Sequence, residues 1–310
     1  MEKVICIVGP TASGKTGLAI ELAKKIDAEI ISADSMQIYK GLDVGTAKVT
    51  KEEAQGIPHH MIDICNPDES FSVADFKSMC YDKIDDIVKR GKKVIIAGGT
   101  GLYVNSVVYD MNFEDEDTDL SYRKELEDIA NTKGKEYLYD MLLKVDKESA
   151  SKIHMNNVKR VIRVLEIAKK TDMLKSEHMK NEKERIEKNS PKYEFIVFCI
   201  EQDRQYLYNR INLRVDLMVK DGIVDEARKV YDMNLPSNST CVQAIGYKEF
   251  FPYFEGSITL QEAIDELKKQ TRHYAKRQMT WFNNKLYVIK LDGRKDKKEL
   301  VDEIIDYIKK

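Results

Sequence analysis

The first apolar run of the chain leads directly into a glycine-bearing loop and then into a segment with helical spacing. The run is Val4–Val8, the loop reads Gly9-Pro10-Thr11-Ala12-Ser13-Gly14-Lys15-Thr16, and apolar residues recur from Leu18 onward. This loop fits the pattern G-x-x-x-x-G-K-[ST], in which backbone N–H groups and a helix N-terminus converge on an anion. Lys15 adds a positive charge, and Thr16 adds a hydroxyl group that suits Mg²⁺. We therefore predict a strand–loop–helix unit that binds phosphate through residues 9–16.

Five further strand-like runs follow, and helical patterns separate most of them. The runs are 28–33, 59–64, 93–97, 195–200 and 285–291. A helix is expected over 71–90, with Ser72 as its cap and Asp75 three residues later. Strands that alternate with helices are typical of a parallel sheet. We predict the α/β fold class, with a P-loop NTPase-like core built on a mostly parallel sheet.

The character of the sequence changes after residue 112. An acidic segment, 114–119, precedes a region in which residues 121–189 show only helical patterns. Within that region, 173–189 is almost wholly polar and predicts an exposed helix or a mobile loop. We predict a P-loop α/β catalytic core formed by residues 1–112 and 192–310, and a helical insertion domain over residues 113–191.

Composition argues against several classes of protein. The 310 residues carry a net charge of −2, and no apolar run approaches the ~18 residues needed to span a bilayer. The chain enters a strand at its first residues, so we expect no signal peptide and a cytoplasmic location. The five cysteines form no C-x-x-C pair, which argues against a disulfide framework and a zinc knuckle. Cys6 and Cys199 lie in apolar runs and are expected in the core.

Polar residues follow two of the predicted strands. Asp34, Ser35 and Gln37 come after 28–33, and Gly98-Gly99-Thr100-Gly101 comes after 93–97. Residues beyond the carboxyl ends of parallel strands face the ligand crevice, so we expect both stretches beside the phosphate loop. A carboxylate there suits a general base, and the Gln37 amide suits a nucleobase edge. The glycine-rich turn is compatible with close approach to a ligand and equally with packing.

Other patterns leave alternatives open. The adjacent His59 and His60 would point to opposite faces of a strand, so we expect packing or loop hydrogen bonds rather than a shared metal. A basic stripe recurs at intervals of three and four, which predicts either a solvated helix face or a polyanion contact; it comprises Lys268, Lys269, Arg272, His273, Lys276 and Arg277. The sequence shows no clear Walker B aspartate and no arginine lid, which permits another role for a bound diphosphate, that of a leaving group.

The sequence resembles the tRNA dimethylallyltransferases, the bacterial enzymes that prenylate the adenine beside the anticodon. The matching stretches span nearly the whole chain in the order of the family. They are Gly9–Thr16, Asp34–Tyr39, Gly45–Lys48, His59-His60, Gly98–Tyr103, Lys159–Arg163, Gln243–Lys248 and Lys276–Phe282. The resemblance implies transfer of a dimethylallyl group from dimethylallyl diphosphate to the exocyclic amine of that adenine, in tRNAs that read codons starting with U.

The resemblance also implies roles for individual residues. Asp34 would be the general base, and Thr100 and Arg214 the other catalytic residues. The diphosphate would bind residues 9–16 and Arg277, with Mg²⁺ as cofactor on Thr16. The partner would be the anticodon stem-loop of tRNA, and a monomer without membrane attachment is expected. The implied tRNA contacts are Asp34, Ser35, Met36, Gln37, Thr100, Arg123, Lys159, Arg160, Val161, Ile162, Arg163, Gln243, Ala244, Ile245, Gly246, Tyr247, Lys248, Lys276, Arg277, Gln278 and Trp281.

Three other functions share part of this pattern. A small-molecule P-loop kinase would share the strand–loop–helix start but would have no use for the insertion. A prenyltransferase acting on free adenine nucleotide would share the catalytic half and would need neither the insertion nor the basic stripe. An RNA-binding ATPase would use the loop and the basic residues without any transfer chemistry.

Overall fold

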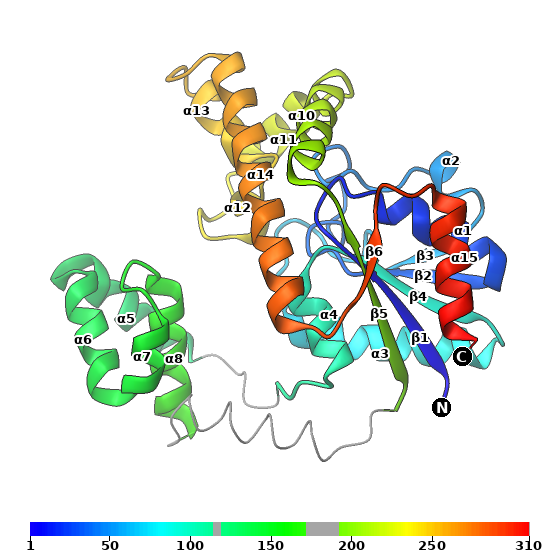
Figure 1. The fold of residues 1–310 in the computed structure, drawn as a ribbon. Helices are drawn as coiled ribbons and strands as arrows, with labels where there is room; N and C mark the ends of the chain where they lie inside the picture. Colours follow the sequence, from blue (N-terminus) through cyan, green and yellow to red (C-terminus); the bar gives the residue numbers. More distant parts are fainter. Residues whose placement is uncertain (114–118, 172–191, 310) are drawn as a thin grey trace. The chain divides into compact units, whose positions relative to one another are not determined.

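A six-stranded parallel sheet organises the larger part of the molecule (Figure 1). The computed structural model describes residues 1–113, 119–171 and 192–309. The strands are β1 (Lys3–Val8), β2 (Ala28–Ser32), β3 (His59–His60), β4 (Lys93–Gly98), β5 (Glu194–Glu201) and β6 (Ile289–Asp292). Their order is β3-β2-β4-β1-β5-β6, and every pairing is parallel. The predicted α/β class with a parallel sheet is confirmed.

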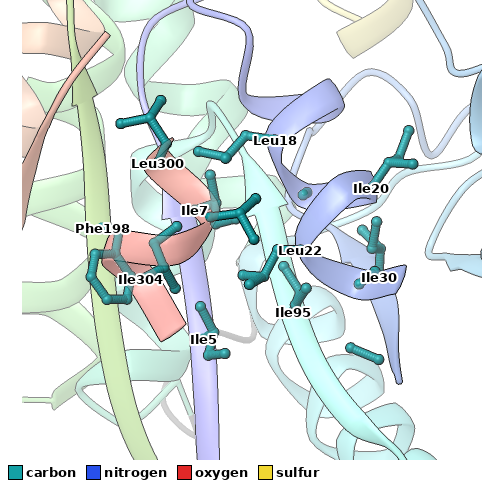
Figure 2. Packing of buried hydrophobic residues seen from close by; sticks show 14 of the residues in the cluster. Ile5, Ile7, Leu18, Ile20, Leu22, Ile30, Ile95, Phe198, Leu300 and Ile304 are labelled. Carbon is teal, nitrogen blue, oxygen red and sulfur yellow. The ribbon is translucent and has the colours of Figure 1, made fainter. Parts of the chain in front are cut away.

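One face of the sheet is covered by α1 (Lys15–Ile26) and α15 (Lys297–Ile308). Successive strand residues point to opposite faces, so Ile5 and Ile7 face these two helices. Figure 2 shows both isoleucines on β1, packed in one cluster with Leu22 of α1 and Ile304 of α15. Burial of each such side chain contributes roughly 1.5–3 kcal/mol. The first and last helices therefore fix the phosphate loop to the centre of the sheet.

The opposite face is covered by α3 (Val73–Lys89) and α4 (Gly101–Val108). The cap predicted for α3 is confirmed: the Ser72 hydroxyl accepts from the Asp75 amide at 3.1 Å, and Asp75 in turn accepts from the Ser72 amide at 2.8 Å. Phe76 of α3 stacks on Tyr103 of α4, with ring centroids 4.1 Å apart. The stacking holds α3 against α4, the helix that begins directly after the glycine-rich turn at the end of β4.

A second group of helices forms its own apolar cluster within the same unit. It comprises α10 (Arg204–Lys220), α11 (Ile223–Asp232), α12 (Thr240–Gln243), the 3-10 turn η1 (Lys248–Phe250), α13 (Phe251–Phe254) and α14 (Leu260–Lys285), while the short α2 (Lys51–Ala54) stands apart. The cluster also includes Ile38, Tyr39 and Leu42 from the segment after β2. It therefore ties the segment that follows Asp34 to the C-terminal half of the chain.

The chain divides into two compact units, 1–108 with 192–310 and 109–191. The second unit contains α5 (Leu120–Lys133), α6 (Lys135–Val145), α7 (Lys147–Lys152) and α8 (Val158–Thr171), and no strand among its described residues. Its core joins Leu126, Leu138, Leu142 and Leu165. The segment 173–189, for which we predicted an exposed helix or loop, lies outside the described residues.

Two predicted strands are shorter than expected. β3 ends at His60 because Met61 and Asp63 adopt positive φ angles of 63° and 55°, which turn the chain out of the sheet. β6 begins only at Ile289, because α14 continues to Lys285. All five cysteines are buried free thiols, as expected for Cys6 and Cys199. Within the described ranges, no helix has the length and apolarity required to cross a membrane.

Candidate active site

Three strand ends lie side by side at the carboxyl edge of the sheet. The strands are β2, β4 and β1, which are neighbours in the sheet order. Beyond the strands, the Ala33 amide donates to the Ala97 carbonyl at 2.9 Å, and the Thr100 amide donates to the Ala33 carbonyl at 3.1 Å. The sheet therefore places the stretch that starts at Asp34 beside the turn that carries Thr100, with the phosphate loop next to that turn.

Hydrogen bonds within the phosphate loop converge on one of its own carbonyl groups, that of Pro10. Gly14 has φ 95°, a left-handed conformation that glycine adopts without a Cβ penalty, and Ala12 has φ 61°. The Ser13 amide and the Lys15 ammonium both donate to the Pro10 carbonyl, each at 3.2 Å. The Ser13 hydroxyl is buried and has no hydrogen-bond partner among the described residues. Lys15 is thus held over the loop, where an anion would displace its bond to Pro10.

Gln278 of α14 joins the phosphate loop to the glycine-rich turn. Its side-chain oxygen accepts from the Thr11 amide at 2.8 Å, and its side-chain nitrogen donates to the Gly99 carbonyl at 2.9 Å. The side chain is buried. Both ends of the Gln278 amide are therefore used in holding the site together, whereas its predicted contact with RNA stays a prediction.

Charge is concentrated around Asp34. Burial, followed by repulsion from Arg214, lowers the pKa of Lys15 to about 8, and attraction to Asp34 opposes that shift. Burial also lowers the pKa of Arg214, again with Asp34 opposing the shift. The carboxylate therefore lies within electrostatic range of the loop lysine and of an arginine from α10. One negative and two positive groups form the charged centre of the site.

Hydrogen bonds fix the residues around this centre. The Met36 amide donates to the Asp34 carboxylate at 2.9 Å, which orients that carboxylate. The Thr100 hydroxyl accepts from the Ser35 amide at 2.9 Å and lies 3.2 Å from the Ser35 hydroxyl. Tyr274 was not among the predicted site residues, yet burial and the nearby Asp34 carboxylate raise its pKa, and its hydroxyl is in hydrogen-bond contact with Thr100. A sequence signal was available, because Tyr274 lies one helical turn before Gln278.

The glycine-rich turn is made for packing within the chain. A Cβ on Gly98 would lie 2.2 Å from the Ala33 carbonyl oxygen, and a Cβ on Gly101 would lie 2.2 Å from the Trp281 ring. Trp281 donates its indole N–H to the Asn105 side chain at 3.1 Å. Of the two alternatives for this turn, the structure favours packing. Trp281 packs on the turn, and its contact with tRNA stays a prediction.

Comparison with known proteins agrees with this geometry. Residues 37–285 match the sequence model of the family described as IPP transferase. The chain belongs to the IPP transferase family. It is 50% identical to the tRNA dimethylallyltransferase of Bacillus cytotoxicus, over 99% of this chain and 95% of that relative. It is 47% identical to the tRNA dimethylallyltransferase of Bacillus subtilis, over 94% of this chain and 91% of that relative.

Two solved structures have the same fold. The tRNA isopentenylpyrophosphate transferase of Bacillus halodurans superposes with a TM-score of 0.73 at 46% identity, covering 99% of this chain and 96% of the other. A eukaryotic dimethylallyltransferase described as acting on tRNA superposes with a TM-score of 0.81 at 31% identity, covering 94% of this chain and 74% of the other. The P-loop NTPase-like core predicted from the sequence is thus the fold of IPP transferases.

In this IPP transferase, Glu226 joins the 43–48 loop to the 243–248 segment. The sequence did not predict Glu226 as a site residue. Glu226 of α11 is 9% exposed, and its carboxylate accepts from the amides of Asp43, Val44 and Gly45 at 2.9, 2.9 and 2.8 Å. It also accepts from the Tyr247 hydroxyl at 2.8 Å. A Cβ on Gly45 would lie 2.7 Å from the Tyr247 ring. Glu226 therefore clamps the 43–48 loop against the 243–248 segment.

The loop held by Glu226 also contacts Gln37, the residue expected to pair with a nucleobase edge. The Gln37 amide nitrogen donates to the carbonyl of Thr46 at 3.3 Å, and its oxygen accepts from the Ser32 hydroxyl at 2.9 Å. The Gln37 amide is therefore already paired inside the protein, and its orientation depends on the clamped loop.

The 243–248 segment offers little surface to RNA. Ala244, Gly246 and Tyr247 are buried, and Ile245 packs on the same apolar cluster. Gln243 is exposed, but its side chain donates to the Ser237 carbonyl at 2.6 Å. The side chains of Ala244 and Tyr247 support the site from within and offer no surface for the predicted tRNA contact. Lys248 is half-buried and keeps a partly accessible cation.

The predicted tRNA contacts Lys159–Arg163, at the start of α8 in the second unit, include both buried and exposed residues. Val161 and Ile162 are buried in that unit's core, so direct RNA contact by their side chains is excluded. Glu166 is also buried and pairs with Arg123 at 2.7 Å and with Arg163 at 3.4 Å. The pair with Arg123 joins α5 to α8, whereas the pair with Arg163 lies within α8. Lys159 and Arg160 remain exposed at the start of α8; of the predicted tRNA contacts in this unit, only these two are exposed.

The basic stripe on α14 is divided in the same way. Lys268 pairs with Asp216 of α10 at 2.6 Å, and Arg272 donates to the Asn212 side chain at 2.6 Å. Lys268 and Arg272 therefore join two helices and do not form a solvated face, which was one of the two alternatives for the stripe. Lys276 and Arg277 are exposed, at the end of the helix that carries Gln278.

Thr16 meets the chemical requirement for Mg²⁺ only in part. Its side chain is exposed at the start of α1, next to Lys15. No cluster of three or more metal-ligating side chains occurs in the ranges that the structure describes. Mg²⁺ commonly keeps several waters and binds through one or two protein oxygens plus substrate phosphates. The single hydroxyl fits a metal that arrives with a diphosphate.

The rings of His59 and His60 form hydrogen bonds with the Ile57 carbonyl and with Glu29, in line with the hydrogen bonds expected for them.

Proposed function

We propose that this IPP transferase transfers a dimethylallyl group from dimethylallyl diphosphate to the exocyclic amine of the adenine beside the anticodon of tRNAs that read codons starting with U. The observation that carries the proposal is the adjacency of an anion-binding loop to an oriented carboxylate, Asp34. Relatives at about 50% identity are named tRNA dimethylallyltransferase, and a structural neighbour is described as acting on tRNA.

In this proposal Asp34 accepts the proton of the attacking amine. An amine conjugated to a purine is a weak nucleophile, so a carboxylate that takes up its proton accelerates attack on the allylic carbon. The Met36 amide orients the carboxylate toward one geometry. The adenine has to leave its stack to reach this group, which costs a few kcal/mol and favours a loop nucleotide. Thr100, held by the Ser35 amide and in contact with Tyr274, would align the base.

The departing diphosphate would be stabilised by the positive end of the site. The amides at the start of α1, those of Lys15 and Thr16, and the Lys15 ammonium would face the position where negative charge develops. Arg214 supplies a second cation near Asp34, and Arg277 a third at the rim. Mg²⁺ bound by Thr16 and the diphosphate oxygens would add positive charge to the leaving group.

The tRNA would be held by exposed cations on both units. Lys159 and Arg160 are accessible on the second unit, and Lys276 and Arg277 on the first. Contacts of this type bind phosphates and position the nucleic acid without reading its sequence. A cytoplasmic monomer that uses dimethylallyl diphosphate as donor completes the proposal.

The test is substitution of the proposed base. Asp34→Asn keeps the shape of the side chain and removes its basicity, so single-turnover prenylation of tRNA should fall by about 10²–10⁴-fold, while tRNA affinity stays within a few-fold. Asp302→Asn, on the exposed surface of α15, is the matched control and should retain full activity. Near-normal turnover of Asp34→Asn would remove Asp34 as the base.

The same assay decides between the competing functions. Labelled dimethylallyl diphosphate is incubated with the protein and tRNA, AMP or ATP. Label in tRNA alone supports the proposal, whereas label in AMP or ATP indicates a prenyltransferase of free nucleotides. ATP consumption without label in any acceptor would indicate a kinase or an ATPase.

A further inference from the structure

The backbone around Gln37 is fixed without any help from the Gln37 side chain. The Asp63 amide donates to the Gln37 carbonyl at 3.1 Å, and the Ile64 amide donates to the Ile38 carbonyl at 2.8 Å. The residue is half-buried and lies just beyond β2, in the stretch that starts at Asp34, so its side chain stays partly accessible at the proposed acceptor site. What remains to be determined is which end of the side-chain amide points in which direction.

Two backbone carbonyls determine the orientation of this amide. The carbonyl oxygens of Thr46 and Ala47 lie 3.3 and 3.4 Å from the Gln37 side-chain nitrogen. A carbonyl oxygen can only accept, so the end of the amide that faces both of them has to be the NH2 group. The amide oxygen then points to Ser32, whose hydroxyl donates to it at 2.9 Å. A hydroxyl can donate or accept, so Ser32 adapts to the orientation that the two carbonyls impose.

These two carbonyls belong to the 43–48 loop, which is held near both of its ends. Near its start, the Glu226 carboxylate accepts from three consecutive loop amides and from the Tyr247 hydroxyl. At its end, the Lys48 ammonium donates to the Tyr39 carbonyl at 2.9 Å. Glu226 is buried and comes from α11, far along the chain from the loop. The direction of the Gln37 amide therefore depends on a distant carboxylate.

The Gln37 amide keeps hydrogen-bonding capacity for a ligand. Its oxygen has two lone pairs, of which the Ser32 hydroxyl uses one. Its nitrogen has two hydrogens, and both of its contacts to the loop are long, as expected where one N–H is shared between neighbouring carbonyls. One acceptor and one donor remain, in a fixed direction. Adenine presents the complementary pair, an amine beside an unprotonated ring nitrogen.

We propose that Gln37 selects adenine as the acceptor base, and that Glu226 is the positioning residue on which this selection depends. A glutamine amide that is free to turn over can pair with adenine or, with its ends exchanged, with the edge of guanine that carries an oxygen beside a ring N–H. An amide held in one orientation distinguishes the two bases. The selection of adenine rests on the proposed function, whereas the orientation of the amide does not.

Binding without a prenyl donor tests the contact with the base. Synthetic anticodon stem-loops carry adenine, 7-deazaadenine or 1-deazaadenine at the acceptor position, and fluorescence anisotropy gives their affinities for the full-length protein. Loss of the ring nitrogen that Gln37 contacts should weaken binding of one deaza stem-loop by about three- to tenfold. Gln37→Met, which has similar length but no amide, should remove that difference. Gln261→Met, exposed on α14, is the matched control and should retain it. Equal affinities in the unmodified protein, or a difference that survives Gln37→Met, overturn the proposal.

Glu226→Gln tests the positioning role. It releases part of the loop, so the preference for an adenine over a guanine stem-loop should fall about tenfold, while affinity for inorganic diphosphate stays unchanged. Tyr247→Phe removes only one bond to Glu226 and should lower the preference less, which keeps the test open if Glu226→Gln folds poorly. Asp225→Asn, exposed on the same helix, should keep the full preference.

The ratio of two affinities separates positioning from stability, because a protein that is merely less stable loses affinity for both stem-loops equally. An unchanged preference in Glu226→Gln and Tyr247→Phe therefore overturns the positioning role. Selective binding of the adenine stem-loop, with no transfer of label from dimethylallyl diphosphate, would refute the proposed function alone.

Discussion

Replacement of Glu226 should destabilise the core unit by about 3 kcal/mol. The change is Glu226→Gln, which keeps the volume of the side chain. One carboxylate oxygen accepts from Asp43 and Val44, and the other from Gly45 and Tyr247. The amide nitrogen of glutamine cannot accept, so two of the four donors lose their partner. Hydrogen bonds to charged groups contribute ~1.5–3 kcal/mol each, and partial hydration of the loop lowers the sum of two toward 3 kcal/mol.

The assay is urea unfolding followed by the fluorescence of Trp281, the single tryptophan of the chain. It lies in α14 and therefore reports on the unit that contains Glu226. Asp225→Asn, exposed on the same helix, should change stability by less than ~0.5 kcal/mol. Tyr247→Phe, combined with Glu226→Gln in a double-mutant cycle, isolates the bond between the two side chains. If Glu226→Gln lowers the free energy of unfolding by less than ~1 kcal/mol, the hydrogen bonds of Glu226 do not stabilise the core unit as argued.

Three further outcomes are expected. Because burial holds the pKa of Lys15 at about 8, diphosphate affinity should fall about tenfold per pH unit above pH 8; calorimetry of Lys15→Arg should show no such decline. Lys159→Ala with Arg160→Ala should weaken tRNA binding and flatten its dependence on salt, and an effect on donor KM alone would contradict the RNA contact. Gly101→Val should destabilise the protein by several kcal/mol in thermal unfolding, because the new side chain meets the Trp281 ring; an unchanged Tm would argue against that packing.

Local patterns were enough to predict most of the sheet and its helices. The apolar run of β1, the loop after it and the capping box at Ser72 are encoded within a few residues, and each is present in the structure. The short β3 was not predictable, because the apolar pattern continues through Met61 while the backbone there turns to positive φ. Apolar spacing reports burial, but it does not report where a chain leaves the sheet.

The site was harder to predict because its supports come from distant residues. Glu226 bonds to Gly45 across 181 residues, and Gln278 bonds to Thr11 across 267 residues. Neither is distinguishable in sequence from a surface polar residue on a helix. The stretches around Tyr247 and Val161 match the family motifs, yet these two side chains are buried. The motifs therefore indicated which stretches of the chain form the site. Only the structure distinguished the accessible residues of these stretches from the buried residues that support them.

The place of β1 in the sheet has a consequence for synthesis on the ribosome. β1 pairs with β4 on one side and with β5 on the other, and β5 follows the whole of Tyr109–Pro191 in the chain. At ~5–20 residues per second, several seconds pass between completion of β4 and emergence of β5. During that interval one side of Val4–Val8 has no pairing partner, and an open apolar edge is prone to aggregation. The yield of the protein in the cell would therefore depend on rapid folding of the inserted helices or on a chaperone that covers this edge.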